Sequence, residues 1–193
     1  MIALDIETSG INYKKCGIWQ IGAVDLESEE EFFEESKIDE EDSIEEGATK
    51  VIGKTEKELR NPEKQSQKQL IINFLKWMDS RKIKSLICQN PQFDYSFIKT
   101  KTEKYGLDSS MPHRCFDLHT ISQLIYYHKN KGFLIKNGKS GIGFTETLKM
   151  CGIEDKRIKL DGEKVIKKGT PHNALEDARL TANCFKELLK QLK

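Results

Sequence analysis

Apolar and polar residues alternate with two different spacings along this chain. Residues 2–6, 18–26 and 31–38 are short and rich in β-forming side chains, which predicts three consecutive strands in a meander. Residues 85–89 form an apolar strand that ends at the turn signal Asn90-Pro91, and a brief strand is expected at 114–116.

Helical spacing fills the intervals between these strands. In residues 65–78, Leu70, Phe74, Trp77 and Met78 fall on one helical face. A meander followed by alternating strands and helices predicts an α/β fold with one mixed sheet and helices on both faces. Two basic segments are expected as loops, 129–143 (a mobile one) and 156–169. The other predicted helices are 44–52, 95–105, 117–128, 144–151 and 173–192.

The composition is that of a globular intracellular protein. The 193 residues are 37% hydrophobic and 33% charged, enough for one domain over residues 1–193 with its own core. No apolar run approaches the roughly 20 residues of a membrane span, and the first residues lack the pattern of a secretory signal. Five dispersed cysteines indicate reduced thiols. We therefore expect a cytoplasmic protein that has no membrane partner.

The net charge of +1 averages two unlike parts of the chain. Residues 25–46 hold 13 acidic side chains and one base, Lys37, whereas the remainder holds 31 bases and 18 acids. A basic body with an acidic β-hairpin region at 25–46 leaves room for a polyanionic ligand on the body. A solvated hairpin face is the alternative explanation of the acidic run, and docking of a protein partner there is another.

The first candidate cluster is Asp5-Ile6-Glu7-Thr8. On a strand, residues two apart project from the same face, so the carboxylates of Asp5 and Glu7 lie together. On a buried strand they would repel each other and lose hydration, and a bound divalent cation removes that cost. The alternative is an edge strand whose polar face meets water.

Two further clusters follow later in the chain. Asp94 comes just after the 85–89 strand, where it is either the N-cap of the next helix or a site residue at the carboxyl end of a strand. Asn173 and Glu176 have the spacing of a capping box, which places His172 and Asp177 together at the start of the last helix. A lone loop histidine is the alternative, but a neighbouring carboxylate makes an incidental role less expected.

In this order, the three clusters resemble the motifs of the DEDD exonucleases, in the histidine-bearing DEDDh branch. That branch includes polymerase proofreading subunits, ribonuclease T and oligoribonuclease. The first motif is matched by Asp5 through Gly10 and continues into Ile18 through Val24. The second is matched by Asn90 through Asp94, and the third by His172 with Asp177.

The resemblance implies a ribonuclease-H-like fold, with a five-stranded mixed β-sheet flanked by α-helices on both faces. It implies two divalent metal ions, Mg²⁺ or Mn²⁺, that clamp a phosphodiester during in-line attack. Asp5, Glu7 and Asp177 would hold one ion, and Asp5 with Asp94 the other. His172 would be the general base, because a neutral imidazole accepts the proton of the attacking water.

Substrate contacts follow from the resemblance with less detail. Trp19 or Phe93 would stack on a base, for which core packing is the alternative. Gln89 departs from the family, in which histidine often stands at that position, and no metal role attaches to it. The remaining expected substrate contacts are Thr8, Ser9, Gly10 and Asn90.

The two basic loops could flank the cleft and contact phosphates, although each side chain alone is also explained by solvation. His113, His119 and His128 match no motif and are expected to be structural. The loop residues concerned are Lys129, Lys131, Lys136, Lys139, Lys156, Arg157, Lys159, Lys164, Lys167 and Lys168.

The expected activity is metal-dependent 3′–5′ exonuclease cleavage at the 3′ ends of single-stranded nucleic acid, releasing nucleoside 5′-monophosphates. DNA is slightly favoured over RNA, and the RNA alternative is an enzyme that trims RNA or degrades oligoribonucleotides. A nucleic-acid-binding module with a decayed site is the rival of a different class. The presence of all five residues, Asp5, Glu7, Asp94, His172 and Asp177, speaks against decay.

Overall fold

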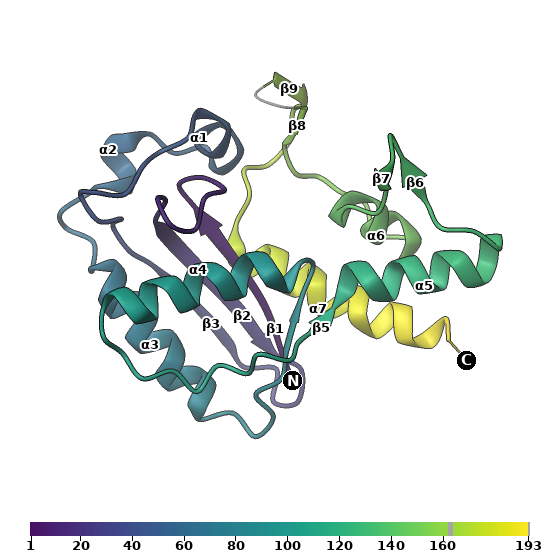
Figure 1. Cartoon of the computed structure of the whole chain (residues 1–193), viewed down its shortest axis with the longest axis horizontal. Helices are drawn as coiled ribbons and strands as arrows, with labels where there is room; N and C mark the ends of the chain where they lie inside the picture. The colour runs from purple at the N-terminus through teal and green to yellow at the C-terminus, as the bar shows by residue number, and fades with distance from the viewer. Residues whose placement is uncertain (162–163, 193) are drawn as a thin grey trace.

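A five-stranded sheet with the order β3-β2-β1-β4-β5 organises the computed structural model, which describes residues 1–161 and 164–192 (Figure 1). The three N-terminal strands pair antiparallel, and the two later strands run parallel to β1. The expected mixed sheet of five strands is thereby confirmed. The strands are β1 (Ile2–Thr8), β2 (Ile18–Asp25), β3 (Glu31–Glu35), β4 (Leu86–Cys88) and β5 (Phe116–Asp117).

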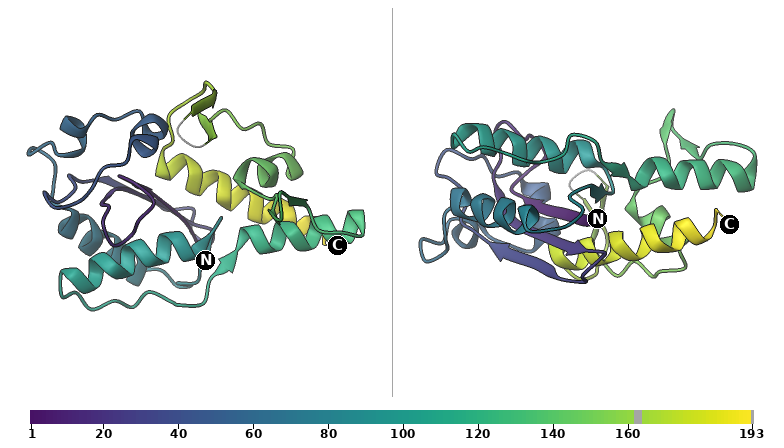
Figure 2. Two further views of the ribbon diagram at one scale, coloured as in Figure 1. Left: turned by 45° about the horizontal axis from the view of Figure 1, so that its top comes forward. Right: turned by 90° about the horizontal axis from the view of Figure 1, so that it is seen from below.

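Helices cover both faces of this sheet, as the sequence predicts (Figure 2). On one face, α3 (Gln67–Asp79) and α4 (Pro91–Lys104) pack on alternate β1 residues such as Leu4 and Ile6. On the other, the apolar side of α7 (Ala174–Lys190) shares a cluster with Ile87 of β4. Among the described helices, none is both long and apolar enough to cross a membrane. The remaining helices are α1 (Glu46–Ile52), α2 (Glu56–Leu59), α5 (Leu118–Asn130) and α6 (Phe144–Met150).

Both segments expected as loops contain short hairpins instead. Strands β6 (Ile135–Lys136) and β7 (Lys139–Ser140) are joined by Asn137-Gly138, whose φ angles of 49° and 73° suit a type I′ turn. Strands β8 (Lys159–Asp161) and β9 (Lys164–Lys167) form the second hairpin, and residues 162 and 163 of that segment lie outside the described residues. Lysine and glycine content hid the alternation that marks a strand.

The predicted acidic β-hairpin region 25–46 is a hairpin only in part, and it packs against the rest of the protein. After β3 it continues irregularly across the molecule, and its carboxylates pair with bases from distant segments. Asp42, 4% exposed, makes a buried ion pair with Lys101 of α4. Further pairs join Glu30 to Arg81, Glu31 to Arg179, Glu35 to Lys64, and Asp39 to Lys104.

Gly22 of β2 brings the start of α7 into direct contact with the sheet. A Cβ atom at this position would lie 2.2 Å from the backbone carbon of Ala174. The side chain of Gln20, on the same strand, accepts a 2.7 Å hydrogen bond from the Ala174 N–H. Because Gly22 pairs with Asp5 in the sheet register, this close approach also sets α7 over the first candidate residue.

Substitution Gly22→Ala is expected to destabilise the protein by about 1–3 kcal/mol, because the added methyl must push α7 off β2. The change is measured as the midpoint and slope of urea unfolding. Gly132→Ala is the matched control, since its Cβ would meet open space. Equal stability of the two variants would contradict the close approach of α7.

Candidate active site

The first two candidate carboxylates stand on the central strand of the sheet. β1 lies between β2 and β4, so the edge-strand alternative is wrong. Glu7 is 7% exposed, and Asp5 points to the same face, toward α7. Two carboxylates on a covered strand face lose hydration and repel each other. On a solvent-exposed edge strand, water would have reduced both effects.

Asp94 lies in the first turn of α4, because the helix begins at Pro91 rather than at Tyr95. The N-cap is Asn90, so the interpretation of Asp94 as the cap is wrong. Proline at the first helical position requires no N–H donor, which explains the earlier start. The carboxylate is 5% exposed, and burial raises its pKa, an effect that the backbone N–H groups of Asp94 itself and of Ile6 partly offset.

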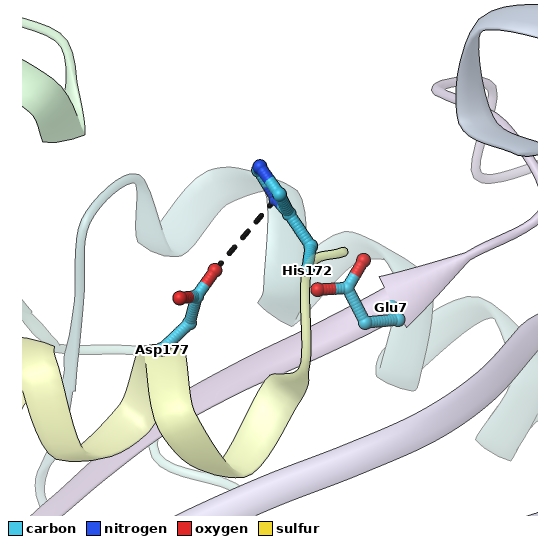
Figure 3. Close-up of side chains that lie close together, drawn as sticks. All are labelled: Glu7, His172 and Asp177. Carbon is cyan, nitrogen blue, oxygen red and sulfur yellow. Dashed lines mark ion pairs between the residues drawn. The ribbon is translucent and has the colours of Figure 1, made fainter. Parts of the chain in front are cut away.

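The start of α7 supplies the third part of the site. Asn173 is the N-cap, and its side-chain oxygen accepts from the N–H groups of Leu175 and Glu176. This cap sets His172 just before the helix and Asp177 in its first turn. Three side chains meet here, and each offers one atom that could bind a metal ion. These three atoms, from Glu7, His172 and Asp177, all lie within 4.8 Å of one another (Figure 3).

Burial raises the pKa of all four carboxyl groups, and repulsion by other site carboxylates raises the pKa of Asp5 and Glu7 further. Burial is the largest cause in each case, and it raises the pKa of Asp5, Glu7 and Asp177 and raises that of Asp94 to about 7. The negative charges of three neighbours raise the pKa of Asp5 further. In decreasing order of effect they are Asp177, Asp94 and Glu7. The structure therefore brings the four predicted carboxylates into one electrostatic cluster.

Arg157 partly compensates this negative charge. Its Nη1 donates to Asp177 Oδ2 at 2.9 Å, and its Nε donates to Asp155 Oδ1 at 3.0 Å. Its guanidinium also lies 4.5 Å from the centre of the Phe144 ring. Arg157 thus bridges a site carboxylate to Asp155, which the Thr145 hydroxyl holds from the other side at 2.6 Å.

One oxygen of the cluster lacks any partner in the described part of the chain. Asp177 Oδ1 is buried and accepts no hydrogen bond, while Oδ2 of the same side chain is held by Arg157. An unpaired buried carboxylate oxygen is costly unless a cation or a proton meets it. Together with Glu7, Asp5 and Asp94, this oxygen offers the hard ligands that Mg²⁺ and Mn²⁺ prefer, so the residues fit a divalent ion.

A backbone carbonyl orients the imidazole of His172, and burial favours the neutral form of the ring. Its Nε2 lies 3.0 Å from the Ile158 carbonyl, which only accepts, so Nε2 carries the proton. Nδ1, unprotonated, faces Asp177 Oδ2 at 3.7 Å. Burial lowers the pKa of His172. The negative charge of Asp177 opposes this effect, and the positive charge of Arg157 reinforces it.

A cavity of about 580 Å³ opens at Thr8, the residue after Glu7, and the acidic side chains of Glu45 and Glu46 form part of its wall. Thr8 and Gly10, both predicted substrate contacts, line it together with apolar side chains of α1 and with Leu160. Ser9 is different, because it is fully buried and its hydroxyl donates to the Ser43 carbonyl at 2.6 Å. The Ser9 hydroxyl is thus engaged in holding the loop together, and the expected substrate contact of Ser9 stays a prediction.

Trp19 does not reach the site as a stacking residue. It is 2% exposed and packs with Ile38, Ile52 and Leu59 in a small core under α1 and α2, so the core-packing alternative is correct. Phe93 is partly buried against Phe97, 4.9 Å between ring centres. Asn90 is exposed at the start of α4, and its role stays a prediction.

Sequence reasoning missed the specific partners of the site. Arg157 was expected only as one of several loop bases, and neither Asp155 nor Gln20 was singled out. Their spacing carries no signal, because an Asp-x-Arg pair is common on any surface loop. Only the fold brings Asp155 and Arg157 to the start of α7.

Comparison with known proteins agrees with this fold. Over 98–100% of this chain, three nuclease structures superpose at 13–18% identity. Escherichia coli exonuclease I with bound single-stranded DNA gives a TM-score of 0.74, 18% identity and 40% coverage of that protein. Cell-death related nuclease 4 gives a TM-score of 0.68, 13% identity and 63% coverage of that protein. The nuclease domain of 3′hExo, a DEDDh family member bound to rAMP, gives a TM-score of 0.65, 13% identity and 90% coverage of that domain.

The chain spans less than two thirds of exonuclease I and of cell-death related nuclease 4. The sequence comparison with curated proteins gave no match. A family model described as RNase_T exonuclease matches residues 2–185, which include every candidate residue of the cluster. This chain therefore belongs to the RNase T exonuclease family.

Proposed function

We propose that this protein is a metal-dependent 3′–5′ exonuclease of the DEDDh type that acts on single-stranded nucleic acid. The observation that carries the proposal is the gathering of Asp5, Glu7, Asp94 and Asp177 at one end of β1, with a neutral His172 beside them. Three buried carboxylates and the half-buried Asp5 are unfavourable together in a resting fold and are suited to holding two divalent ions.

Bound divalent ions would supply Lewis-acid activation of water and charge stabilisation of the leaving 3′-oxygen. The side chains do the rest. His172 Nδ1 accepts the proton of the attacking water, while the Ile158 carbonyl keeps the imidazole oriented through Nε2. Thr8, Gly10 and the apolar wall of α1 enclose the terminal nucleoside. Asp5, Glu7, Asp94 and Asp177 remain ionised once the ions are present.

DNA is the preferred substrate in this proposal, with RNA as the second candidate. Its support is the set of exonuclease I neighbours solved with dT13 and dA16 oligonucleotides, at 18–19% identity. The rAMP held by 3′hExo is the corresponding support for RNA.

Incubation of 5′-labelled single-stranded DNA or RNA with Mg²⁺ or Mn²⁺ is expected to give a ladder of products shortened one nucleotide at a time. Asp5→Asn should abolish it, because that carboxylate would contact both ions. Intact substrate with both metals would reject the catalytic proposal in favour of a binding module. The ratio of DNA to RNA rates measures sugar preference.

His172→Ala is expected to lower turnover about 10²–10⁴-fold, the usual range for a general base, while metal affinity stays near that of the wild type. Single-turnover kinetics and calorimetric Mn²⁺ titration measure the two quantities. His113→Ala, at an exposed histidine away from the site, is the control. Unchanged turnover of His172→Ala would remove it from the mechanism.

At one fixed Mn²⁺ concentration, about 100 times the Kd at pH 8, the ion is expected to raise the melting temperature of the protein by several degrees at pH 8. The increase should be larger at pH 8 than at pH 5.5, because the carboxyls, including Asp94 with a pKa of about 7, must lose protons to bind the ion. Asp177→Asn should remove the effect. A shift that is the same at both pH values would show that the metal binds elsewhere.

A further inference from the structure

We propose that the free side of α5 and the β6–β7 hairpin form a second binding surface for single-stranded nucleic acid, which holds the strand upstream of the 3′ end. We call this surface the aromatic platform, and it consists of Tyr127, Phe133 and Ile135 with the lysines around them. It lies outside the candidate active site and extends the proposed function, on which it rests. The lysines are Lys129, Lys131 and Lys139.

The apolar part of the platform is exposed without a covering element among the described residues. Phe133 is 56% exposed and Tyr127 is 46% exposed, and their ring centres lie 4.8 Å apart. Ile135, two residues beyond Phe133 along the hairpin, is 57% exposed. Two adjacent exposed rings are a stacking surface that any base can use, since every base has a π-face.

The charge of this segment matches a polyanion. Residues 118–145 contain no aspartate or glutamate, although the chain holds 31 acids in 193 residues. Four lysines lie in the same stretch, and among the described residues only Lys136 of these four pairs with an acid, Glu146, at 3.0 Å. Protein–protein interfaces are depleted in lysine at their centres, so aromatic rings surrounded by lysines favour a nucleic-acid strand over a protein partner.

The hairpin is held rigidly on α5, which pre-organises the platform. The side chain of Gln123, 8% exposed, donates to the Leu134 carbonyl at 2.9 Å and accepts from the Leu134 N–H at 3.1 Å. It also lies 2.6 Å from the Ser140 hydroxyl, to which His119 binds from the preceding turn of α5. Both strands of the hairpin are therefore tied to one buried glutamine.

The position of the platform suits the upstream strand. It lies at the end of the molecule where α5 and the C-terminal end of α7 run side by side (Figure 1), and Lys129 donates to Gln191 at 2.6 Å there. From Asp177 to Gln191, α7 rises about 21 Å. At 3.4 Å per stacked nucleotide, a strand needs on the order of six nucleotides to span that length.

The test compares a trinucleotide with a 20-nucleotide strand of the same 3′ sequence. The double variant Tyr127→Ala/Phe133→Ala is expected to raise KM for the 20-nucleotide strand about tenfold or more, with kcat and the trinucleotide KM unchanged. Tyr127→Phe/Phe133→Tyr keeps the rings and should retain wild-type KM. Phe33→Ala, which removes a ring of 42% exposure from the acidic strand β3, is the matched control.

A second measurement tests the charge. In the Asp5→Asn protein without metal, Lys129→Gln/Lys139→Gln should make the dependence of log Kd on log salt shallower by about 0.7 for each lysine that contacts a phosphate. Fluorescence anisotropy of a labelled 20-nucleotide strand gives both Kd and the salt slope. An unchanged slope together with an unchanged long-strand KM in the aromatic variant would overturn the platform.

The outcomes separate this proposal from the proposed function. If wild type cleaves nothing but the aromatic variant loses anisotropy binding, the exonuclease proposal fails and the platform stands. If wild type cleaves and the aromatic variant has wild-type KM values for both the trinucleotide and the 20-nucleotide strand, the platform is overturned while the exonuclease proposal stands. A wild-type dimer that the aromatic variant dissociates, with no change in strand binding, would assign the surface to a second copy of the chain and overturn the platform.

Discussion

Repulsion between buried carboxylates is the constraint on which the rest of the structure depends. Asp5 and Glu7 project from the central strand, and Asp94 and Asp177 approach from helices on opposite faces of the sheet. Each loses hydration, and burial raises the pKa of each. Arg157 offsets part of the charge, and the unpaired oxygen of Asp177 marks where a cation is needed. The fold therefore holds an unfavourable charge distribution that the proposed divalent ions would relieve.

Packing distant from the charges keeps them in place. Gly22 admits α7 to the sheet, Gln20 bonds the first N–H of that helix, and Asn173 caps it. Each contact is ordinary, but together they determine where His172 and Asp177 stand relative to β1. Several acidic residues of region 25–46, among them Glu30, Glu31 and Asp42, likewise form ion pairs with bases of the body, so the two oppositely charged parts of the chain pack together.

The fold and the acidic cluster could be predicted because both follow from local patterns. Alternation on residues 2–6 indicates a strand that points Asp5 and Glu7 to one face, and the spacing of Asn173 and Glu176 indicates a helix start. The sequence leaves base stacking and core packing both open for Trp19, because an aromatic ring has the same sequence signature in a core and in a cleft. Arg157 could not be assigned, because its partners Asp155 and Asp177 meet it only through tertiary geometry.

The wide separation of the site residues along the chain has a consequence for folding and synthesis. Glu7, Asp94 and Asp177 are each more than 80 residues from the next, and α7 closes the arrangement by packing on β1 and β2. Such contacts of high sequence separation form slowly and late. A chain still emerging from the ribosome has the first two motifs but no Asp177, so the assembled cluster arises only after the last helix docks. Docking of α7 is thus the step that would complete the proposed active site.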